Sequence, residues 1–137
     1  MDDFKHVRVG VGLAVIRDGK VLLQKRKEGH AGGTWCFPGG HLEKWEDIET
    51  AAVRELTEEA GTVYISPPKL WTTVNTKYED EDKHYVVILL KCNWVAGSPQ
   101  VMEPDKCECW GWYDWDSLPS PLIQGLQIVK YKGLSPI

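Results

Sequence analysis

The chain has 137 residues, of which 42% are hydrophobic and 26% charged, and its formal net charge is −4. This length and balance suit one ordinary globular domain, and we expect a single domain over residues 1–137. The acidic balance argues against a dedicated nucleic-acid-binding protein, which normally shows a basic face. It leaves small anionic substrates open, because a bound metal or a local group of Lys and Arg reverses the field at one site.

The sequence has no basic-then-apolar signal pattern at its start. Its longest apolar run, residues 11–16, is far shorter than the roughly 20 residues that a membrane-spanning helix needs. Neither zinc-ribbon nor C-x-x-C spacing relates the four cysteines, which are Cys36, Cys92, Cys107 and Cys109. Free thiols are the simplest interpretation, so we expect a cytoplasmic protein without a membrane partner.

The first predicted element is a strand over residues 7–16, which is rich in Val and Gly. Asp18-Gly19 follows between apolar runs and is a strong hairpin signal. The return strand begins at Val21 and ends in the basic stretch 25–27. A flexible glycine loop, EGHAGGTW, then leads into a short strand at residues 35–37 that Pro38 stops.

The pattern becomes helical from Asp47 to Ala60, where apolar residues recur every four positions. Asp47 is a suitable N-cap and Gly61 a suitable residue just past the helix end. Further strands are predicted at residues 70–78, at 84–93 and around the alternating Trp110 and Trp112. A turn at 79–82, a loop at 96–106 and a second helix at 122–132 complete a mixed α+β pattern.

Three carboxylates, Glu55, Glu58 and Glu59, stand in the last turns of the predicted central helix. The C-terminal end of a helix is already partly negative, so each costs roughly 0.3–1 kcal/mol there when exposed. Their spacing places them on one side of the helix, where they form a set of hard oxygen ligands suited to Mg²⁺ or Mn²⁺. The alternative is an acidic solvated face in which Arg54 pairs with Glu58 by i,i+4 contact.

The spacing of this region carries a resemblance. Gly40, five residues, Glu46, seven residues and then RELTEEAG at 54–61 resemble the Nudix box, the signature of hydrolases that cut nucleoside diphosphates linked to another group. The order of elements resembles the Nudix α/β/α sandwich over nearly the whole chain. PGGHLE, His84-Tyr85 and EPDKCECWGWYDW resemble a narrower branch with MutT-type nucleotide triphosphate diphosphatases and a plant relative acting on a prenyl diphosphate.

The resemblance implies roles for the residues of the box. Glu55 and Glu59 match the principal metal ligands, and Glu58 is a further ligand or a base. The backbone carbonyl of Gly39 is the expected oxygen ligand from the loop, and Arg54 would pair with Glu46 and orient the cluster. Many members have glycine where this chain has Trp45. If that turn requires a positive φ, Trp is poorly suited to it.

Many members also use a glutamate from a late loop, both as a catalytic group and as a metal ligand. Glu108 is our candidate for this glutamate, with Glu103 second and a plain surface carboxylate as the alternative. Arg26 is placed to hold a phosphate, though an exposed charge at a strand end is the competing interpretation.

Gly39 and Gly40 allow a close backbone approach to substrate, and Phe37 and His41 flank them. Trp35, Trp71, Trp110 and Trp112 are further candidates to stack on a base, although a Trp is more often in the core.

We therefore expect a Mg²⁺-dependent nucleoside triphosphate diphosphatase, with Mn²⁺ as a substitute, that releases pyrophosphate and a nucleoside monophosphate. A modified or oxidised dNTP is one candidate substrate. The same chemistry on a prenyl diphosphate, a nucleotide sugar or ADP-ribose is the alternative. A nucleotide sensor without hydrolysis is a third reading, disfavoured because Glu46 and the three helix carboxylates are retained. The expected partner is a small nucleotide, with no nucleic acid, and the resemblance makes a homodimer plausible.

Overall fold

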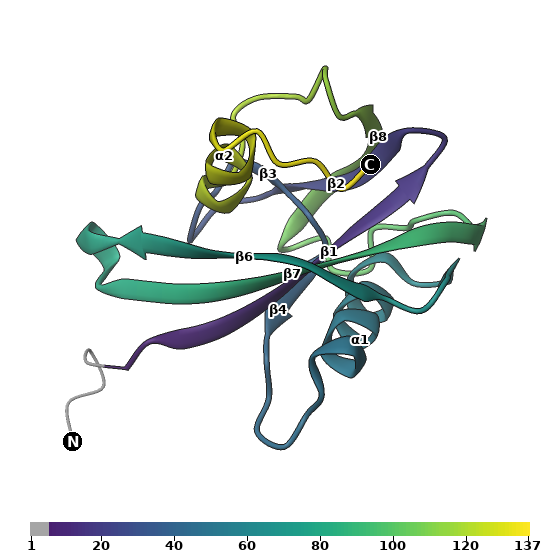
Figure 1. Cartoon of the computed structure of the whole chain (residues 1–137). Coiled ribbons are helices and arrows are strands. Elements are labelled where there is room, and N and C mark those ends of the chain that lie inside the picture. The colour runs from purple at the N-terminus through teal and green to yellow at the C-terminus, as the bar shows by residue number, and fades with distance from the viewer. Residues whose placement is uncertain (1–5) are drawn as a thin grey trace.

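The structure is a computed structural model that describes residues 6–137 (Figure 1), so the first five residues of the predicted domain lie outside the description. The described residues form eight strands, two α-helices and one short 3₁₀ turn. In chain order they are β1 (Arg8–Arg17), β2 (Lys20–Arg26), β3 (Trp35–Cys36), β4 (Gly39–His41), α1 (Ile48–Ala60), β5 (Val63–Ile65), β6 (Lys69–Tyr78), η2 (Glu79–Glu81), β7 (Lys83–Gly97), β8 (Cys107–Asp114) and α2 (Gln124–Tyr131).

The strands form one mixed sheet with β1 near its centre. β1 runs parallel to β7, with Arg8 opposite Tyr85 and Ile16 opposite Asn93. The other pairings between these eight strands are antiparallel: β2 and β4 pair with β1, β3 and β8 pair with β2, and β5 and β6 pair with β7. This topology brings β4, which precedes α1, against the first half of β1.

The two helices cover opposite faces of the sheet (Figure 1), and each face has its own apolar core. Along β1, Leu13 and Val15 point to the core under α1, whereas Ala14 points to the core under α2. Successive side chains of a strand point to opposite faces, so a strand buried on both faces is continuously apolar. The predicted α+β fold with an α/β/α sandwich is confirmed.

Helix α1 follows the sequence prediction closely. Its N-cap is Asp47, and the residue after its last turn is Gly61 with φ 75°. Ala52 and Leu56 are buried on its inner side. The predicted hairpin also forms, with positive φ at both Asp18 and Gly19.

Helix α2 is shorter than predicted, because pairing with β3 holds its first predicted residues extended. Leu122 bridges to Trp35, and the N–H of Ile123 donates to the Trp35 carbonyl at 3.0 Å. The sequence analysis also missed β4 and β5, which are only three residues long. β7 continues to Gly97, beyond the predicted end at Asn93, because β5 pairs with its last residues.

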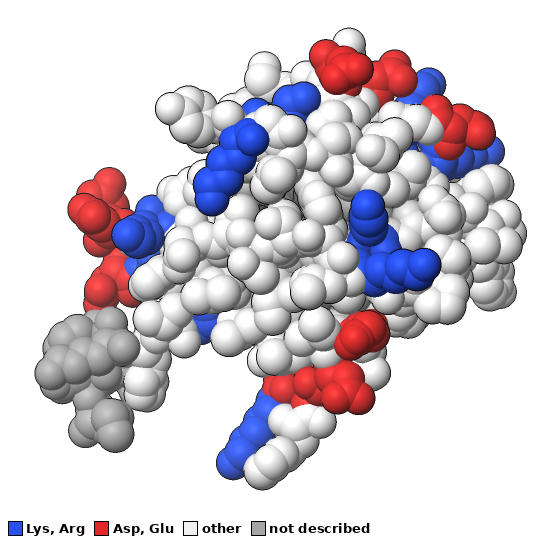
Figure 2. Space-filling model, in the orientation of Figure 1, with Lys and Arg blue, Asp and Glu red and all other residues white. Residues whose placement is uncertain are grey.

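The four cysteines are free thiols, and three of them are buried. Among residues 6–137, no helix is both long and apolar enough to cross a membrane. On the face drawn in Figure 2, basic side chains occur in small groups interspersed with acidic ones.

Candidate active site

A cavity of about 460 Å³ opens where β1, β4, β6 and β7 meet α1, α2 and two loops. Its walls are of two kinds. One part is lined by ionisable side chains and the glycine pair, including Gly39, Gly40, Glu55, Glu58 and Glu59. Another part is apolar and comes from strands β6 and β7 and helix α2, including Val74, Leu89, Ile123 and Leu126. The cavity therefore offers an anionic centre next to a surface suited to an apolar or aromatic group.

Glu59 is the most buried of the three helix carboxylates. Its Oε1 accepts a hydrogen bond from the backbone N–H of Gly39 at 2.8 Å, which ties the end of α1 to β4. Burial nevertheless raises the pKa of Glu59 to about 7, and the nearby charge of Glu55 adds to the rise. A carboxylate held in this environment is stabilised by a cation.

Arg54 holds the cluster together from its edge. Its Nε and Nη2 donate to the two carboxylate oxygens of Glu46 at 2.7 and 2.9 Å, and its Nη1 donates to Glu55 at 2.8 Å. Glu58 is more distant, at 3.4 Å from Nη1. Nη2 also donates to the carbonyl of His41 at 3.1 Å. The Glu46 contact is bidentate, a geometry that fixes orientation as well as supplying attraction.

Gly40 lies where the side chain of Glu55 on helix α1 comes very close to the backbone of β4. A Cβ atom at this position would lie 2.5 Å from both carboxylate oxygens of Glu55. Any larger residue would push the Glu55 side chain out of its place. The glycine therefore serves the carboxylate cluster as well as an approaching ligand.

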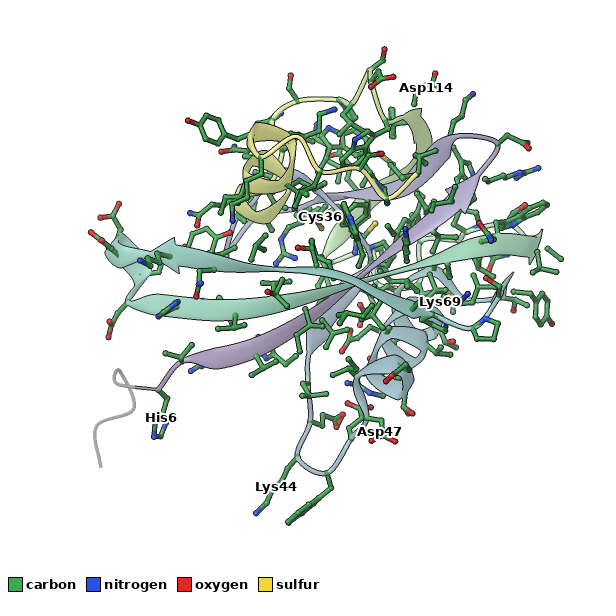
Figure 3. All side chains as sticks on the ribbon, in the orientation of Figure 1. His6, Cys36, Lys44, Asp47, Lys69 and Asp114 are labelled. Atoms are coloured by element: carbon green, nitrogen blue, oxygen red, sulfur yellow. The ribbon has the colours of Figure 1, made fainter. Side chains whose placement is uncertain are left out.

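The turn before α1 has the positive φ that the sequence analysis considered. Trp45 has φ 71° and its side chain is 90% exposed. The loop between β4 and α1 projects from the body of the molecule, with Lys44 at its tip (Figure 3). Trp45 thus adopts a left-handed conformation with almost no packing to compensate it.

The donor set fits a hard divalent cation. The carboxylates of Glu55, Glu58 and Glu59 line the cavity together with Gly39, and all of these ligand atoms are oxygen. Among residues 6–137, no three His, Cys, Asp or Glu side chains converge closely enough to form a complete metal cage. Mg²⁺ does not need one, because it usually keeps several waters and takes one or two carboxylates plus substrate phosphates.

The structure places only one of the two candidate glutamates, Glu103 and Glu108, at the cavity. Glu103 lies in the loop before β8 and lines the cavity. Burial is the main cause that raises the pKa values of Glu55 and Glu59, and the charge of Glu103 adds a smaller part. Glu108 is within β8 and lies outside this cavity. Its side chain is 54% exposed and 3.7 Å from Lys25 Nζ.

Of the predicted substrate-binding residues, Arg26, Phe37, Gly39, Gly40 and His41 all line the cavity. The four candidate Trp residues do not: Trp110 and Trp112 pack against the core under α1, and Trp35 and Trp71 pack against the core under α2.

The sequence analysis missed several lining residues, including His30, Thr76, Tyr78, Tyr85 and Lys106. Alternation along the predicted strand 70–78 would have placed Thr76 and Tyr78 on one face, but nothing local indicated that this face borders the cavity.

The fold and the site together define a hydrolase of phosphoanhydride bonds. The family model for the NUDIX domain matches residues 6–132, and the chain belongs to this family. It is accordingly an enzyme of the Nudix hydrolase class.

Particular relatives are similar to different degrees. An ADP-ribose pyrophosphatase of Methanocaldococcus jannaschii is 28% identical over 93% of this chain and 73% of its own length. An oxidized purine nucleoside triphosphate hydrolase of Danio rerio is 32% identical over 77% of this chain and 65% of its own length. An 8-oxo-dGTP diphosphatase of Proteus vulgaris is 40% identical over 58% of this chain and 71% of its own length.

Among solved structures, a MutT NUDIX hydrolase from Burkholderia pseudomallei superposes with a TM-score of 0.85 and 36% identity. The match covers 90% of this chain and 95% of the other.

Proposed function

We propose that this chain is a divalent-metal-dependent nucleoside triphosphate diphosphatase that releases pyrophosphate and a nucleoside monophosphate. One observation carries the proposal: a single cavity joins a cluster of carboxylates around the half-buried Glu59 to an apolar wall from β6, β7 and α2. Such a cavity suits a substrate with a phosphate chain at one end and a base at the other. Modified or oxidised dNTPs are the proposed substrates, supported by the names of the zebrafish and Proteus relatives.

Glu55, Glu58, Glu59 and the carbonyl of Gly39 would hold Mg²⁺, with Mn²⁺ as a substitute. When bound, such an ion neutralises phosphate oxygens and lowers the pKa of an attacking water. Arg54 keeps Glu55 in place through its hydrogen bond. Arg26, at the end of β2 and on the cavity wall, is the proposed phosphate ligand.

A proton must leave the attacking water, and a carboxylate at the cavity wall is the natural acceptor. We assign this role to Glu103, in place of Glu108, because Glu103 lines the cavity and its charge acts on Glu59. Glu58 is the second candidate for the base, since it is the most exposed of the three helix carboxylates and Arg54 holds it more weakly than Glu55.

The proposal is tested by product analysis with Mg²⁺ over normal and oxidised dNTPs, NTPs, ADP-ribose, nucleotide sugars and geranyl diphosphate. Pyrophosphate and a monophosphate from one triphosphate are expected. Turnover of ADP-ribose alone would favour the second candidate, which the similarity to the Methanocaldococcus protein supports. Tight nucleotide binding without turnover would favour a sensor.

The proposed partners are small nucleotides. The scattered basic side chains in Figure 2 support the absence of a nucleic-acid partner, because no continuous basic stripe crosses that face. Homodimerisation and a cytoplasmic location stay predictions, which light scattering and cell fractionation test.

A further inference from the structure

The glycine loop between β2 and β3, residues 27–34, borders the cavity and is held there by contacts with two other segments. His30 Nδ1 lies 3.0 Å from each carboxylate oxygen of Glu81, which belongs to the η2 turn and is 51 residues away in sequence. The loop is also tied to β2, because Arg26 Nε donates to the His30 carbonyl at 3.0 Å. The loop therefore joins the end of β2 to the turn between β6 and β7.

Four aromatic rings form one wall of the cavity. His41 stacks on Tyr85 with ring centroids 5.6 Å apart, Tyr85 is 6.0 Å from His30, and His30 meets Tyr78 edge-on at 4.4 Å. All four residues line the cavity. His41 forms the end of this wall beside Gly39 and Gly40, close to the helix carboxylates. His30 and Tyr78 form the other end of the wall.

His30 stands between the cavity and Glu81. His30 lines the cavity, whereas Glu81 does not, and their side chains are 20% and 39% exposed. The hydrogen bond from His30 holds the pKa of Glu81 below its usual range, so this carboxylate is ionised and anchors the imidazole at neutral pH. Lys83 Nζ lies 3.6 Å from Glu81 and is the other charged group at this contact.

His30 lies closer to the proposed phosphate-binding region of the cavity than to the surface proposed to bind the base. Its backbone is bonded to Arg26, the proposed phosphate ligand. The apolar surface suited to a base is formed instead by Val74, Leu89, Ile123 and Leu126. With a phosphate held at Arg26, a group attached beyond that phosphate would lie near the ring of His30.

We propose that His30, anchored by Glu81, is a specificity-determining residue that limits the group a substrate can carry beyond its phosphates. The intact wall admits a nucleotide that ends in a phosphate and excludes one whose second phosphate bears a sugar. This inference rests on the proposed function, because it assigns the phosphate end of the same cavity.

The test compares substrates that share a base, so that contacts with the base cancel. The ratio of kcat/KM for ADP-ribose to that for ATP is measured with Mg²⁺, and GDP-mannose with GTP forms a second matched pair. His30→Ala should raise both ratios by about tenfold or more, through a lower KM for the larger substrate. Glu81→Ala, which releases the ring without deleting it, should raise them less.

Two further variants distinguish steric exclusion by the ring of His30 from a non-specific structural change in this region. His30→Phe keeps a ring against Tyr78 but loses the bond to Glu81, and it should stay within about threefold of the wild-type ratio. Glu79→Ala changes a carboxylate in the same turn that does not contact His30, and it should behave as wild type. Thermal melts show whether each variant is folded.

Unchanged ratios in folded His30→Ala and Glu81→Ala would overturn the proposal, as would a His30→Phe variant that behaves like His30→Ala. The affinities of the same four ligands, measured by calorimetry in a Glu59→Gln background, test the size limit without turnover. If the wild type hydrolyses no triphosphate, the proposed function fails, while these affinities still decide on His30. Equal affinity for both members of each pair, with and without His30→Ala, would overturn the size limit alone.

Discussion

Arg54 and Glu46 are joined by two parallel hydrogen bonds, of 2.7 Å from Nε and 2.9 Å from Nη2. The same guanidinium donates to Glu55 at 2.8 Å from Nη1. The loop before α1 is thus coupled to a proposed metal ligand two turns along the helix. Because Arg54 acts through Glu55, it is a positioning residue.

Arg54→Lys should lower kcat/KM by about 10- to 100-fold, because lysine keeps the charge but cannot make the parallel pair of bonds. The apparent affinity for Mn²⁺, followed by electron paramagnetic resonance, should fall with it. Arg17→Lys is the matched control, since Arg17 stacks 3.8 Å from the centre of the Trp94 ring and away from the cavity. Full activity of Arg54→Lys would contradict the positioning role.

The stability of the metal-free protein should depend on the protonation of Glu59. Burial raises its pKa to about 7, against 4.5 for an ordinary glutamate. The folded state therefore keeps a proton that the unfolded state has released between these pH values. The stability from this proton is fully present below pH 4.5 and is lost as the pH rises through 7.

Glu59→Gln should abolish turnover and, in EDTA at pH 8, stabilise the fold by about 2–3 kcal/mol. Glutamine keeps an oxygen to accept the Gly39 hydrogen bond but carries no buried charge. Urea unfolding from pH 5 to 8 should show a decline in the wild type that this variant lacks. A parallel decline in both would mean that Glu59 does not cause it.

Glu103 and Glu108 should differ sharply when each is changed to glutamine. Glu103→Gln removes a carboxylate from the cavity and should lower kcat about 100-fold or more. Glu108→Gln removes only a largely exposed partner of Lys25, so its kcat should stay within about threefold of wild type. Steady-state kinetics of the two variants at saturating Mg²⁺ decides between them, and the reverse order would restore Glu108.

Gly40→Ala should impair the site while leaving the protein folded. The new Cβ would lie 2.5 Å from the Glu55 oxygens, and the flexible end of that side chain can move away. We expect a loss of activity of at least about tenfold with a small change in melting temperature. Gly133→Ala is a folding control with open space around its Cβ, although its φ of 72° adds strain. Normal activity of Gly40→Ala would show that Glu55 need not occupy its present place.

Trp45→Gly should stabilise the protein by up to about 1 kcal/mol, because glycine adopts φ 71° without the steric cost that Trp bears. The gain is limited because glycine also increases the freedom of the unfolded chain. Trp45→Ala keeps a Cβ and should not give this gain, so the difference between the two melting curves isolates the backbone effect. Equal stability of both variants would place the cause elsewhere.

The sequence was informative wherever the determining interactions are local. The spacing of Glu55, Glu58 and Glu59 predicts one shared side of a helix because helical geometry is set within a turn or two. Asp18-Gly19 likewise predicts the hairpin, because a two-residue turn depends mainly on its own backbone preferences. The resemblance to the Nudix box rests on spacing of the same local kind.

The sequence did not predict features that depend on strand pairing or on the path of a long loop. β4 and β5 have three residues each and too little alternation to be recognised, and they form because β1 and β7 offer edges to pair with. The sequence favoured Glu108 over Glu103, five residues away, whereas the path of the loop before β8 brings Glu103 to the cavity wall.

The chain alone therefore determined the family, the central helix and the carboxylates at its end, since these depend on short-range spacing. Only the tertiary structure decided which groups surround those carboxylates. Tyr78, Tyr85 and His30 come together because long-range sheet pairing and the contact of His30 with Glu81 bring distant segments to one cavity. Pairings of that range depend on the whole fold, and no local pattern encodes them.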